Sequence, residues 1–258
     1  MADRVTLITG ASSGIGTELA RLFAANGHKT VLVARREDRL KQLADDIANA
    51  GHPRPMVIVC DLKDASAGEI IAREISAAGC EVEYVVNNAG FGMFGNAIEM
   101  DRAEQLAMVD INVRILTDLS LRFAEDLVRN RGGMLNVASI ASFLPGPRMA
   151  VYYATKAYVL SFTEAMRGEI GPKGVRVTAL CPGPVPTEFQ GRAGFEAGLD
   201  SAILNVSAAA VARAGYRGLM SNKRLVLPGV GVRMIPFLLR FAPRSMVLAS
   251  VAKVQQKR

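Results

Sequence analysis

The sequence predicts an α/β fold: a Rossmann-type, doubly wound parallel sheet of about seven strands, with helices on both faces. Short, almost continuous runs of Val, Ile, Leu and Ala recur along the chain, which is typical of strands buried on both faces. Longer segments with apolar residues at helical spacing lie between these runs. Strands that alternate with helices pair in parallel through right-handed crossovers, so the alternation predicts a single sheet.

The elements follow one another in a regular order. The first expected strand is 5–9, and the first expected helix, 15–26, places Leu19, Leu22 and Phe23 on one face. The other expected strands are 30–34, 56–60, 84–86, 134–138, 175–180 and 224–227. The other expected helices are 37–50, 65–78, 101–130 and 152–170.

No linker, repeat or low-complexity tract interrupts this order, so we expect a single domain. Its catalytic and dinucleotide-binding part should span 1–228. A short helical extension, 229–258, should pack on the same domain.

The composition excludes several classes of site. Half of the 258 residues are hydrophobic, as in a globular protein. Cys60, Cys80 and Cys181 lie far apart, and His28 and His52 are the only histidines, so neither a metal site nor a His-based triad is expected. The start of the chain lacks a signal-peptide pattern, and no apolar stretch reaches about 18 residues. We therefore expect a cytoplasmic protein with reduced thiols.

A glycine-rich turn joins the first strand to the first helix. Glycine permits a close approach of the backbone, and a helix N-terminus offers free N–H groups to a phosphate. The spacing is Gly-x-x-x-Gly-x-Gly, which differs from the common Gly-x-Gly-x-x-Gly fingerprint. The residues expected to contact a dinucleotide here are Gly10, Ser12, Ser13, Gly14, Ile15 and Gly16.

The end of the second strand favours NADP(H) over NAD(H). Many NAD sites place an acid here to bind the ribose 2′-hydroxyl, but this chain has Ala34. Arg35 and Arg36 follow and can donate charge-assisted hydrogen bonds to a 2′-phosphate. The alternative is that one or both arginines are simply solvated at the start of a helix.

Asp61 and Leu62 end the third strand beside the expected cofactor crevice. The Asp61 carboxylate could accept a hydrogen bond from an adenine amino group. It could instead cap the helix that follows.

Taken together, six motifs resemble the short-chain dehydrogenase/reductase family. They occur in the family's order, and the resemblance covers residues 3–228. The motifs are Thr9-Gly10-x-x-x-Gly14-Ile15-Gly16, Asn87-Asn88-Ala89-Gly90, Asn112, Ser139, Tyr152-x-x-x-Lys156 and Pro182-Gly183.

The resemblance implies a catalytic role for four residues. Tyr152 would be the general acid or base, and Ser139 would polarise and orient the substrate carbonyl. Lys156, on the same helical face as Tyr152, should lower the pKa of the phenol and bond the nicotinamide ribose. Asn112 would hold a water that relays protons to Lys156.

The resemblance also implies that two further segments contact the cofactor. The first lies after the fourth strand, and the second follows the sixth. Their residues are Asn88, Ala89, Gly90, Pro182, Gly183, Val185 and Thr187.

The implied activity is hydride transfer between NADP(H) and a carbonyl or alcohol. Apolar residues flank the expected pocket, including Phe91, Phe94, Phe143, Phe189 and Phe195, and favour a hydrophobic substrate. Reduction of a C=C bond remains an alternative, as does a catalytically silent NADP(H)-binding sensor or scaffold. The family resemblance further implies a homodimer or homotetramer.

The C-terminal segment is basic and apolar. Residues 201–258 contain ten Lys and Arg and no acid. Arg233, Arg240 and Arg244 recur at spacings of seven and four among large apolar residues. Such a segment in 230–258 can lie on an anionic membrane surface, or it can pack within the molecule or against a second subunit. No nucleic-acid-binding motif is present.

Overall fold

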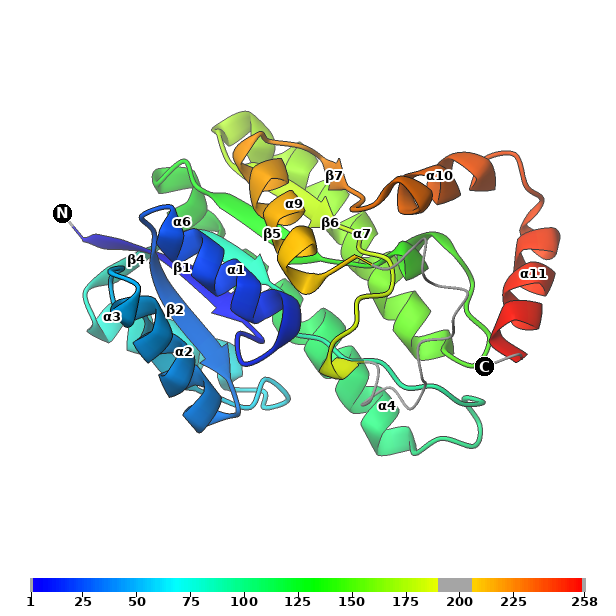
Figure 1. Ribbon diagram of the computed structural model, residues 1–258, viewed down its shortest axis with the longest axis horizontal. Helices are drawn as coiled ribbons and strands as arrows, with labels where there is room; N and C mark the ends of the chain where they lie inside the picture. Colours follow the sequence, from blue (N-terminus) through cyan, green and yellow to red (C-terminus); the bar gives the residue numbers. More distant parts are fainter. Residues whose placement is uncertain (1, 190–205, 257–258) are drawn as a thin grey trace.

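A parallel sheet of seven strands forms the centre of the computed structural model, which describes residues 2–189 and 206–256. The strand order is β3-β2-β1-β4-β5-β6-β7, and every pair is parallel. The chain reverses its direction of winding between β1 and β4 (Figure 1). The strands are β1 (Asp3–Thr9), β2 (Lys29–Ala34), β3 (Met56–Val59), β4 (Cys80–Asn87), β5 (Gly133–Val137), β6 (Arg176–Leu180) and β7 (Leu225–Val226).

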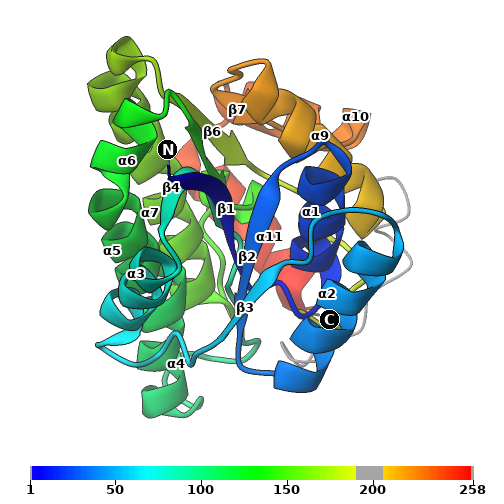
Figure 2. The same cartoon turned by 90° about the vertical axis from the view of Figure 1, so that its left-hand side faces the viewer.

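Helices cover both faces of this sheet (Figure 2). One layer contains α1 (Gly14–Ala25), α2 (Glu37–Asn49) and α9 (Ala208–Met220). The other contains α3 (Ala67–Ala77), α4 (Arg102–Val109), α5 (Ile115–Arg122), α6 (Ala124–Arg129) and α7 (Ala150–Ile170). Successive residues of one strand enter opposite cores: Leu7 packs in the core on the α7 side, and Ile8 packs in the core on the α1 side. The doubly wound sheet predicted from the sequence is therefore confirmed.

The segment 101–130, predicted as one long helix, is helical from Arg102 to Arg129 except at Phe123, but it is not one regular helix. The segment is divided into α4, a π-helical turn at Asp110–Arg114, α5 and α6. The turn places Asn112 fully inside the molecule, where its amide bonds to groups outside the helix. These tertiary bonds have no signature in the helical periodicity of the sequence.

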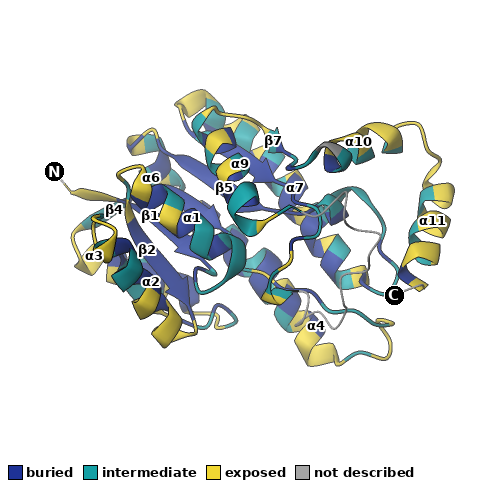
Figure 3. Cartoon of the chain, viewed as in Figure 1, coloured by how far each residue is buried: buried dark blue, intermediate teal, exposed yellow. Residues whose placement is uncertain are grey.

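Two further helices follow β7. α10 (Val230–Leu239) and α11 (Arg244–Gln256) form an arm beside the domain (Figure 1). Val232 of α10 and Gln255 of α11 are buried, whereas much of the remaining arm is exposed (Figure 3). Within residues 2–189 and 206–256, every helix falls short of the length and apolar character needed to cross a membrane. The division of the chain at 228 stays a prediction.

Candidate active site

A cavity of about 460 Å³ opens at the carboxyl ends of the strands. This is the edge at which open α/β sheets bind their ligands. Of the residues predicted for the site, nineteen line this cavity: Gly10, Ser12, Ser13, Gly14, Ile15, Arg35, Arg36, Asp61, Leu62, Asn88, Ala89, Gly90, Ser139, Tyr152, Lys156, Pro182, Gly183, Val185 and Thr187. Gly16 and Asn112 do not line the cavity. Gly16 packs against Gly10, and Asn112 bonds to Phe91, and both of these partners do line it.

The glycine turn has the conformation that a phosphate cradle needs. Gly10 and Gly14 have φ of +67° and +57°, a region that residues with a Cβ rarely adopt. A Cβ on Gly16 would lie 2.3 Å from the Gly10 carbonyl oxygen and 2.5 Å from Asn88 Nδ2. Asn88 Nδ2 in turn donates to the carbonyl oxygen of Thr9 at 2.9 Å. The turn is thus held close against the end of β4, and it leaves the start of α1 open to an anionic group.

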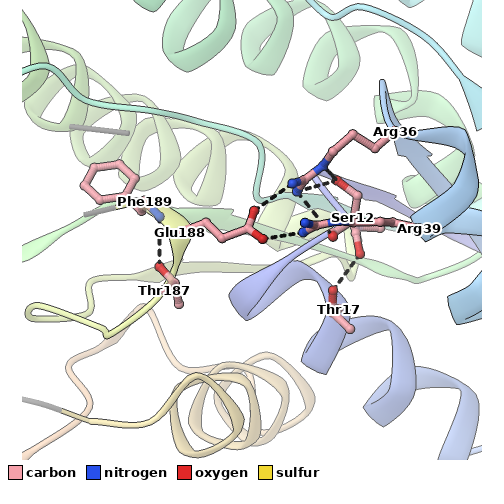
Figure 4. Close-up of polar contacts among 8 residues, drawn as sticks. Ser12, Thr17, Arg36, Arg39, Thr187, Glu188 and Phe189 are labelled. Carbon is pink, nitrogen blue, oxygen red and sulfur yellow. Dashed lines mark hydrogen bonds and ion pairs between the residues drawn. The ribbon is translucent and has the colours of Figure 1, made fainter. Parts of the chain in front are cut away.

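The arginines after β2 contact acidic and polar groups of the chain itself. Arg36 donates from Nε and Nη2 to Ser12 Oγ, at 3.2 and 3.1 Å. Its Nη1 donates to Glu188 Oε2 at 2.7 Å, and Arg39 Nη1 donates to Glu188 Oε1 (Figure 4). Arg35 Nη1 lies 3.7 Å from Asp61 Oδ2. The arginines therefore form an anion-binding surface next to the glycine turn.

Asp61 does not cap the helix that follows it, so that alternative is wrong. α3 begins only at Ala67, and its N-terminal neighbour is Ser66. Asp61 Oδ1 instead accepts from the backbone N–H of Lys63 at 3.0 Å, which closes a tight turn. The carboxylate therefore stays at the cavity wall, where the sequence predicts it.

Tyr152 and Ser139 meet at the inner end of the cavity. Ser139 follows β5 and accepts from the Ala141 N–H at 3.1 Å, so its side chain is held in place. Burial raises the pKa of the Tyr152 phenol to about 12, and a hydrogen bond with the Ser139 hydroxyl opposes that rise. At neutral pH the phenol is therefore protonated and can donate.

The pKa of Tyr152 is raised in this structure because burial dominates it, so the net lowering predicted from the spacing of Tyr152 and Lys156 is wrong. Lys156 Nζ lies 6.0 Å from the centroid of the Tyr152 ring and donates to the carbonyl oxygen of Val137 at 2.8 Å. Burial lowers the pKa of the ammonium to about 8. Four residues of spacing place both side chains on one helical face, but the carbonyl at the end of β5 sets the direction of the lysine.

Asn112 joins three parts of the site. Its Nδ2 donates to the Phe91 carbonyl oxygen at 2.9 Å and to Thr155 Oγ1 at 3.0 Å, and its Oδ1 accepts from Phe91 N–H at 3.1 Å. A Cβ on Gly90 would lie 3.0 Å from Asn112 Oδ1 and 3.3 Å from Lys156 Nζ. Asn112 Oδ1 and Lys156 Nζ thus both lie close to Gly90. The proton relay through a water stays a prediction.

Only some of the apolar residues predicted to flank the pocket line the cavity. Phe91 and Phe189 line the cavity, and the Phe189 ring lies 5.5 Å from that of Tyr152. Phe94 and Phe143 do not line it: Phe94 lies under the Arg148 guanidinium, and Phe143 packs near α5 and α7. Phe195 lies outside the described residues.

Several residues of the site were not predicted. Arg39 lies three residues after Arg36 on α2, a spacing that could have indicated it. Glu188 and Thr155 gave no such signal, because their contacts join positions far apart in the chain. Tyr153 lines the cavity and also accepts from Gln255 Nε2 of the arm at 3.1 Å. Across the described ranges, no cluster of three or more His, Cys, Asp or Glu could hold a metal ion.

Comparison with known proteins identifies the family. A family model described as short chain dehydrogenase matches residues 4–196. The chain belongs to the short-chain dehydrogenase/reductase family. Members of this family are NAD(P)-dependent oxidoreductases that act on CH–OH and C=O groups, and this chain is one of them.

Two curated relatives of this short-chain dehydrogenase are similar in identity but differ in the share of their own length that the match covers. It is 36% identical over 192 residues to sulfoacetaldehyde reductase 2 of Chromohalobacter salexigens, covering 73% of this chain and 75% of the relative. It is 33% identical over 198 residues to the probable oxidoreductase EphD of Mycobacterium tuberculosis. That match covers 76% of this chain but only 33% of the longer relative.

Solved structures of family members agree with the fold. A short-chain dehydrogenase from Sphingobium yanoikuyae, in complex with NADPH, is 28% identical with a TM-score of 0.81 and 91% coverage of both chains. A family member from Burkholderia phymatum, in complex with NAD, is 25% identical with a TM-score of 0.80 and 92% coverage of both. Solved members of the family thus bind both nicotinamide cofactors.

Proposed function

We propose that this enzyme interconverts a carbonyl compound and its alcohol with NADP(H), and that Tyr152 is its general acid and base. The observation that carries the proposal is the Tyr152 phenol, which lines the cavity and forms a hydrogen bond with the Ser139 hydroxyl. A phenol that can donate and a hydroxyl that can orient are the two groups that a carbonyl oxygen needs during reduction.

Each of the four expected catalytic residues has a distinct task in this proposal. The Ser139 hydroxyl orients the substrate oxygen, and the Tyr152 hydroxyl gives it a proton in reduction or takes one in oxidation. When bound, the nicotinamide supplies or accepts the hydride. Lys156 provides positive charge at the end of β5, and Asn112 holds the segment after β4 against α7.

The anion-binding surface after β2 supports a preference for NADP(H). Arg36 and Arg39 already bind a carboxylate at this surface, so their guanidinium groups are aimed at an anion. Ala34 adds no competing acid at the end of β2. A 2′-phosphate would meet two guanidinium groups there, whereas a 2′-hydroxyl would meet no carboxylate dedicated to it.

The proposed substrate is hydrophobic. Phe91, Met149 and Phe189 border the cavity around Tyr152. The charged substrate in the name of the relative from Chromohalobacter salexigens would need a cation near Tyr152. Two cations lie four residues from Tyr152 in the sequence. Lys156 donates to the Val137 carbonyl oxygen, and Arg148 lies over the Phe94 ring and donates to the Gln255 carbonyl oxygen.

A panel of carbonyl compounds, followed by the loss of NADPH absorbance, tests the proposal. We expect turnover of apolar ketones or aldehydes, slower turnover of short anionic aldehydes, and a higher kcat/KM with NADPH than with NADH. Binding of NADPH without turnover of any compound would favour the rival function, a cofactor-binding sensor or scaffold. Reduction of C=C bonds alone would assign the site a different reaction.

We also propose that the arm formed by α10 and α11 contacts an anionic membrane surface from the cytoplasmic side. Along α10 and the turn that follows it, Met234, Phe237, Leu238 and Phe241 recur at helical spacing and are between 49% and 76% exposed. Arg233 and Arg240, seven residues apart, flank this stripe. Two such stripes paired across a dimer would bring basic residues together, with no acid in 201–258 to neutralise them.

Co-sedimentation with vesicles tests the arm. Vesicles rich in phosphatidylserine should carry the enzyme into the pellet, and neutral phosphatidylcholine vesicles should not. Phe237→Ser combined with Phe241→Ser should return it to the supernatant. The matched control, Leu106→Ser with Leu121→Ser, removes exposed apolar residues elsewhere and should leave sedimentation unchanged. Equal recovery of all forms in the supernatant contradicts membrane contact.

We further propose that the enzyme is a homodimer or homotetramer, as the family resemblance implies. Sedimentation velocity of the same protein measures its assembly state.

A further inference from the structure

Glu188 is bound at both of its carboxylate oxygens by arginines that lie about 150 residues away in the sequence. Oε2 accepts from Arg36 Nη1 at 2.7 Å, and Oε1 accepts from Arg39 Nη1 (Figure 4). Arg39 and Arg36 together lower the pKa of the Glu188 carboxyl, so it is anionic at neutral pH. The start of α2 is thus an anion site, and the segment after β6 supplies its anion.

This anion site adjoins the cradle for the cofactor phosphates. Arg36 also donates to Ser12 in the glycine turn. A Cβ on Gly14 would lie 3.1 Å from Thr187 Cγ2, so the residue before Glu188 covers the same turn. In a dinucleotide fold, the end of β2 is where the ribose 2′ group is recognised. The Glu188 carboxylate therefore lies beside the position expected for a 2′-phosphate.

Phe189, the residue after Glu188, lies beside Tyr152 in the same cavity. The Phe189 ring lies 5.5 Å from the Tyr152 ring, tilted by 52°. A Cβ on Gly92 would be 2.9 Å from Phe189 Cζ, so the ring is wedged between Tyr152 and the segment after β4. Two consecutive residues, Glu188 and Phe189, thus connect the arginine pair to the catalytic tyrosine.

We propose that Glu188 is a specificity-determining residue that competes with the 2′-phosphate of NADP(H) for Arg36 and Arg39. Displacement of Glu188 by that phosphate frees the Thr187–Phe189 segment and moves the Phe189 ring away from Tyr152. NAD(H) carries no 2′-phosphate and leaves Glu188 in place. This inference rests on the proposed NADP(H) preference and adds a residue that senses the 2′-phosphate.

The contacts are suited to exchange. The side chains of Glu188, Arg36 and Arg39 are between 42% and 51% exposed, so solvent screens their attraction. A phosphate has more negative charge and more acceptor oxygens than a carboxylate, so it can replace Glu188 at both arginines. The competing carboxylate should weaken binding of the 2′-phosphate by about two- to fivefold, the range for exposed ion pairs.

Calorimetry with two nicotinamide-free probes tests the competition. Adenosine 2′,5′-bisphosphate carries the 2′-phosphate, and adenosine 5′-monophosphate lacks it. Glu188→Gln and Glu188→Ala should each lower the Kd of the bisphosphate by about two- to fivefold and leave that of the monophosphate unchanged. Glu37→Gln, the control, removes an acid at the start of the same helix that pairs with Lys41, and it should change neither value.

A fluorescent reporter tests the link to Tyr152. The chain has no Trp, so Phe189→Trp introduces a single indole next to Tyr152. The bisphosphate should shift its emission and the monophosphate should not. In Phe189→Trp with Glu188→Gln, the shift should be present before any probe is added.

The outcomes separate this inference from the proposed function. Equal Kd values of the two probes for the unaltered enzyme would contradict the NADP(H) preference and, with it, this inference. A second outcome would overturn only the role of Glu188. In that outcome the unaltered enzyme binds the bisphosphate more tightly than the monophosphate, but Glu188→Gln, Glu188→Ala and Glu37→Gln all bind the bisphosphate with the same Kd. An indole emission that ignores the bisphosphate would overturn the movement of Phe189.

Discussion

Asn112 and Phe91 form a reciprocal pair of hydrogen bonds: Asn112 Nδ2 donates to the Phe91 carbonyl oxygen at 2.9 Å, and the Phe91 N–H donates to Asn112 Oδ1 at 3.1 Å. The side-chain amide thus satisfies both backbone groups of a buried residue that belongs to no strand. The π-helical turn Asp110–Arg114 holds Asn112 in this position, and such turns are frequent at functional sites.

This pairing predicts a strict requirement for the amide. Asn112→Ala leaves a buried N–H and C=O of Phe91 without their partner, so we expect the free energy of unfolding to fall by more than about 2 kcal/mol. Asn112→Asp keeps the size but places a carboxylate oxygen against the Phe91 carbonyl, and it should also destabilise. Urea denaturation measures both. An Asp variant as stable as the original chain would contradict the assigned hydrogen bonds.

Substitution by alanine should have opposite effects on stability at Gly16 and at Gly168. Gly16→Ala places a Cβ 2.3 Å from the Gly10 carbonyl oxygen, so the turn must shift at a cost of about 1–3 kcal/mol, and NADPH should bind more weakly. Gly168→Ala, in α7, meets no atom within 4 Å and should stabilise by about 0.5–1 kcal/mol. Thermal unfolding and NADPH titration of both variants measure the contrast. Tight NADPH binding by Gly16→Ala would show that the turn does not need this close approach.

The part of this site that the sequence predicts best is the set of turns that follow the strands. The residues after β1, β2, β4 and β5 line the cavity as predicted, because parallel strands bring their carboxyl ends to one edge. The direction of Lys156 and the pairing of Glu188 with Arg39 were not predictable. Helical spacing fixes a face but not the partner of a long side chain, and contacts between distant segments form only through tertiary packing.

Burial of Lys156 predicts a pH dependence of stability. The pKa of this group is lowered from 10.5 to about 8 in the folded protein, so between these values the unfolded chain holds a proton that the folded chain lacks. The free energy of unfolding, relative to that of Lys156→Met, should be flat below pH 8. It should then rise by at most about 1.4 kcal/mol per pH unit up to pH 10.5. A difference that falls across this window would contradict the burial of the charged amine.

The adjacent tyrosine predicts a structural effect without a catalytic one. Tyr153→Phe removes the hydroxyl that accepts from Gln255 Nε2 at 3.1 Å, which fastens α11 to α7. We expect a loss of about 1 kcal/mol in stability and faster proteolysis of residues 230–256, with little change in kcat. Limited trypsin digestion and steady-state kinetics measure the two effects. A large loss of kcat with an intact arm would assign Tyr153 to the chemistry instead.

Tyr152→Phe gives the sharpest comparison, because it removes one oxygen and leaves the ring that packs against Phe189. The kinetics of NADPH oxidation should be measured for this variant and for Tyr153→Phe, together with the Kd of NADPH. We expect Tyr152→Phe to bind NADPH normally and to lose about 10²- to 10⁴-fold in kcat, the range for general acid catalysis. Turnover by Tyr152→Phe close to that of the unaltered enzyme would contradict the proton transfer assigned to Tyr152.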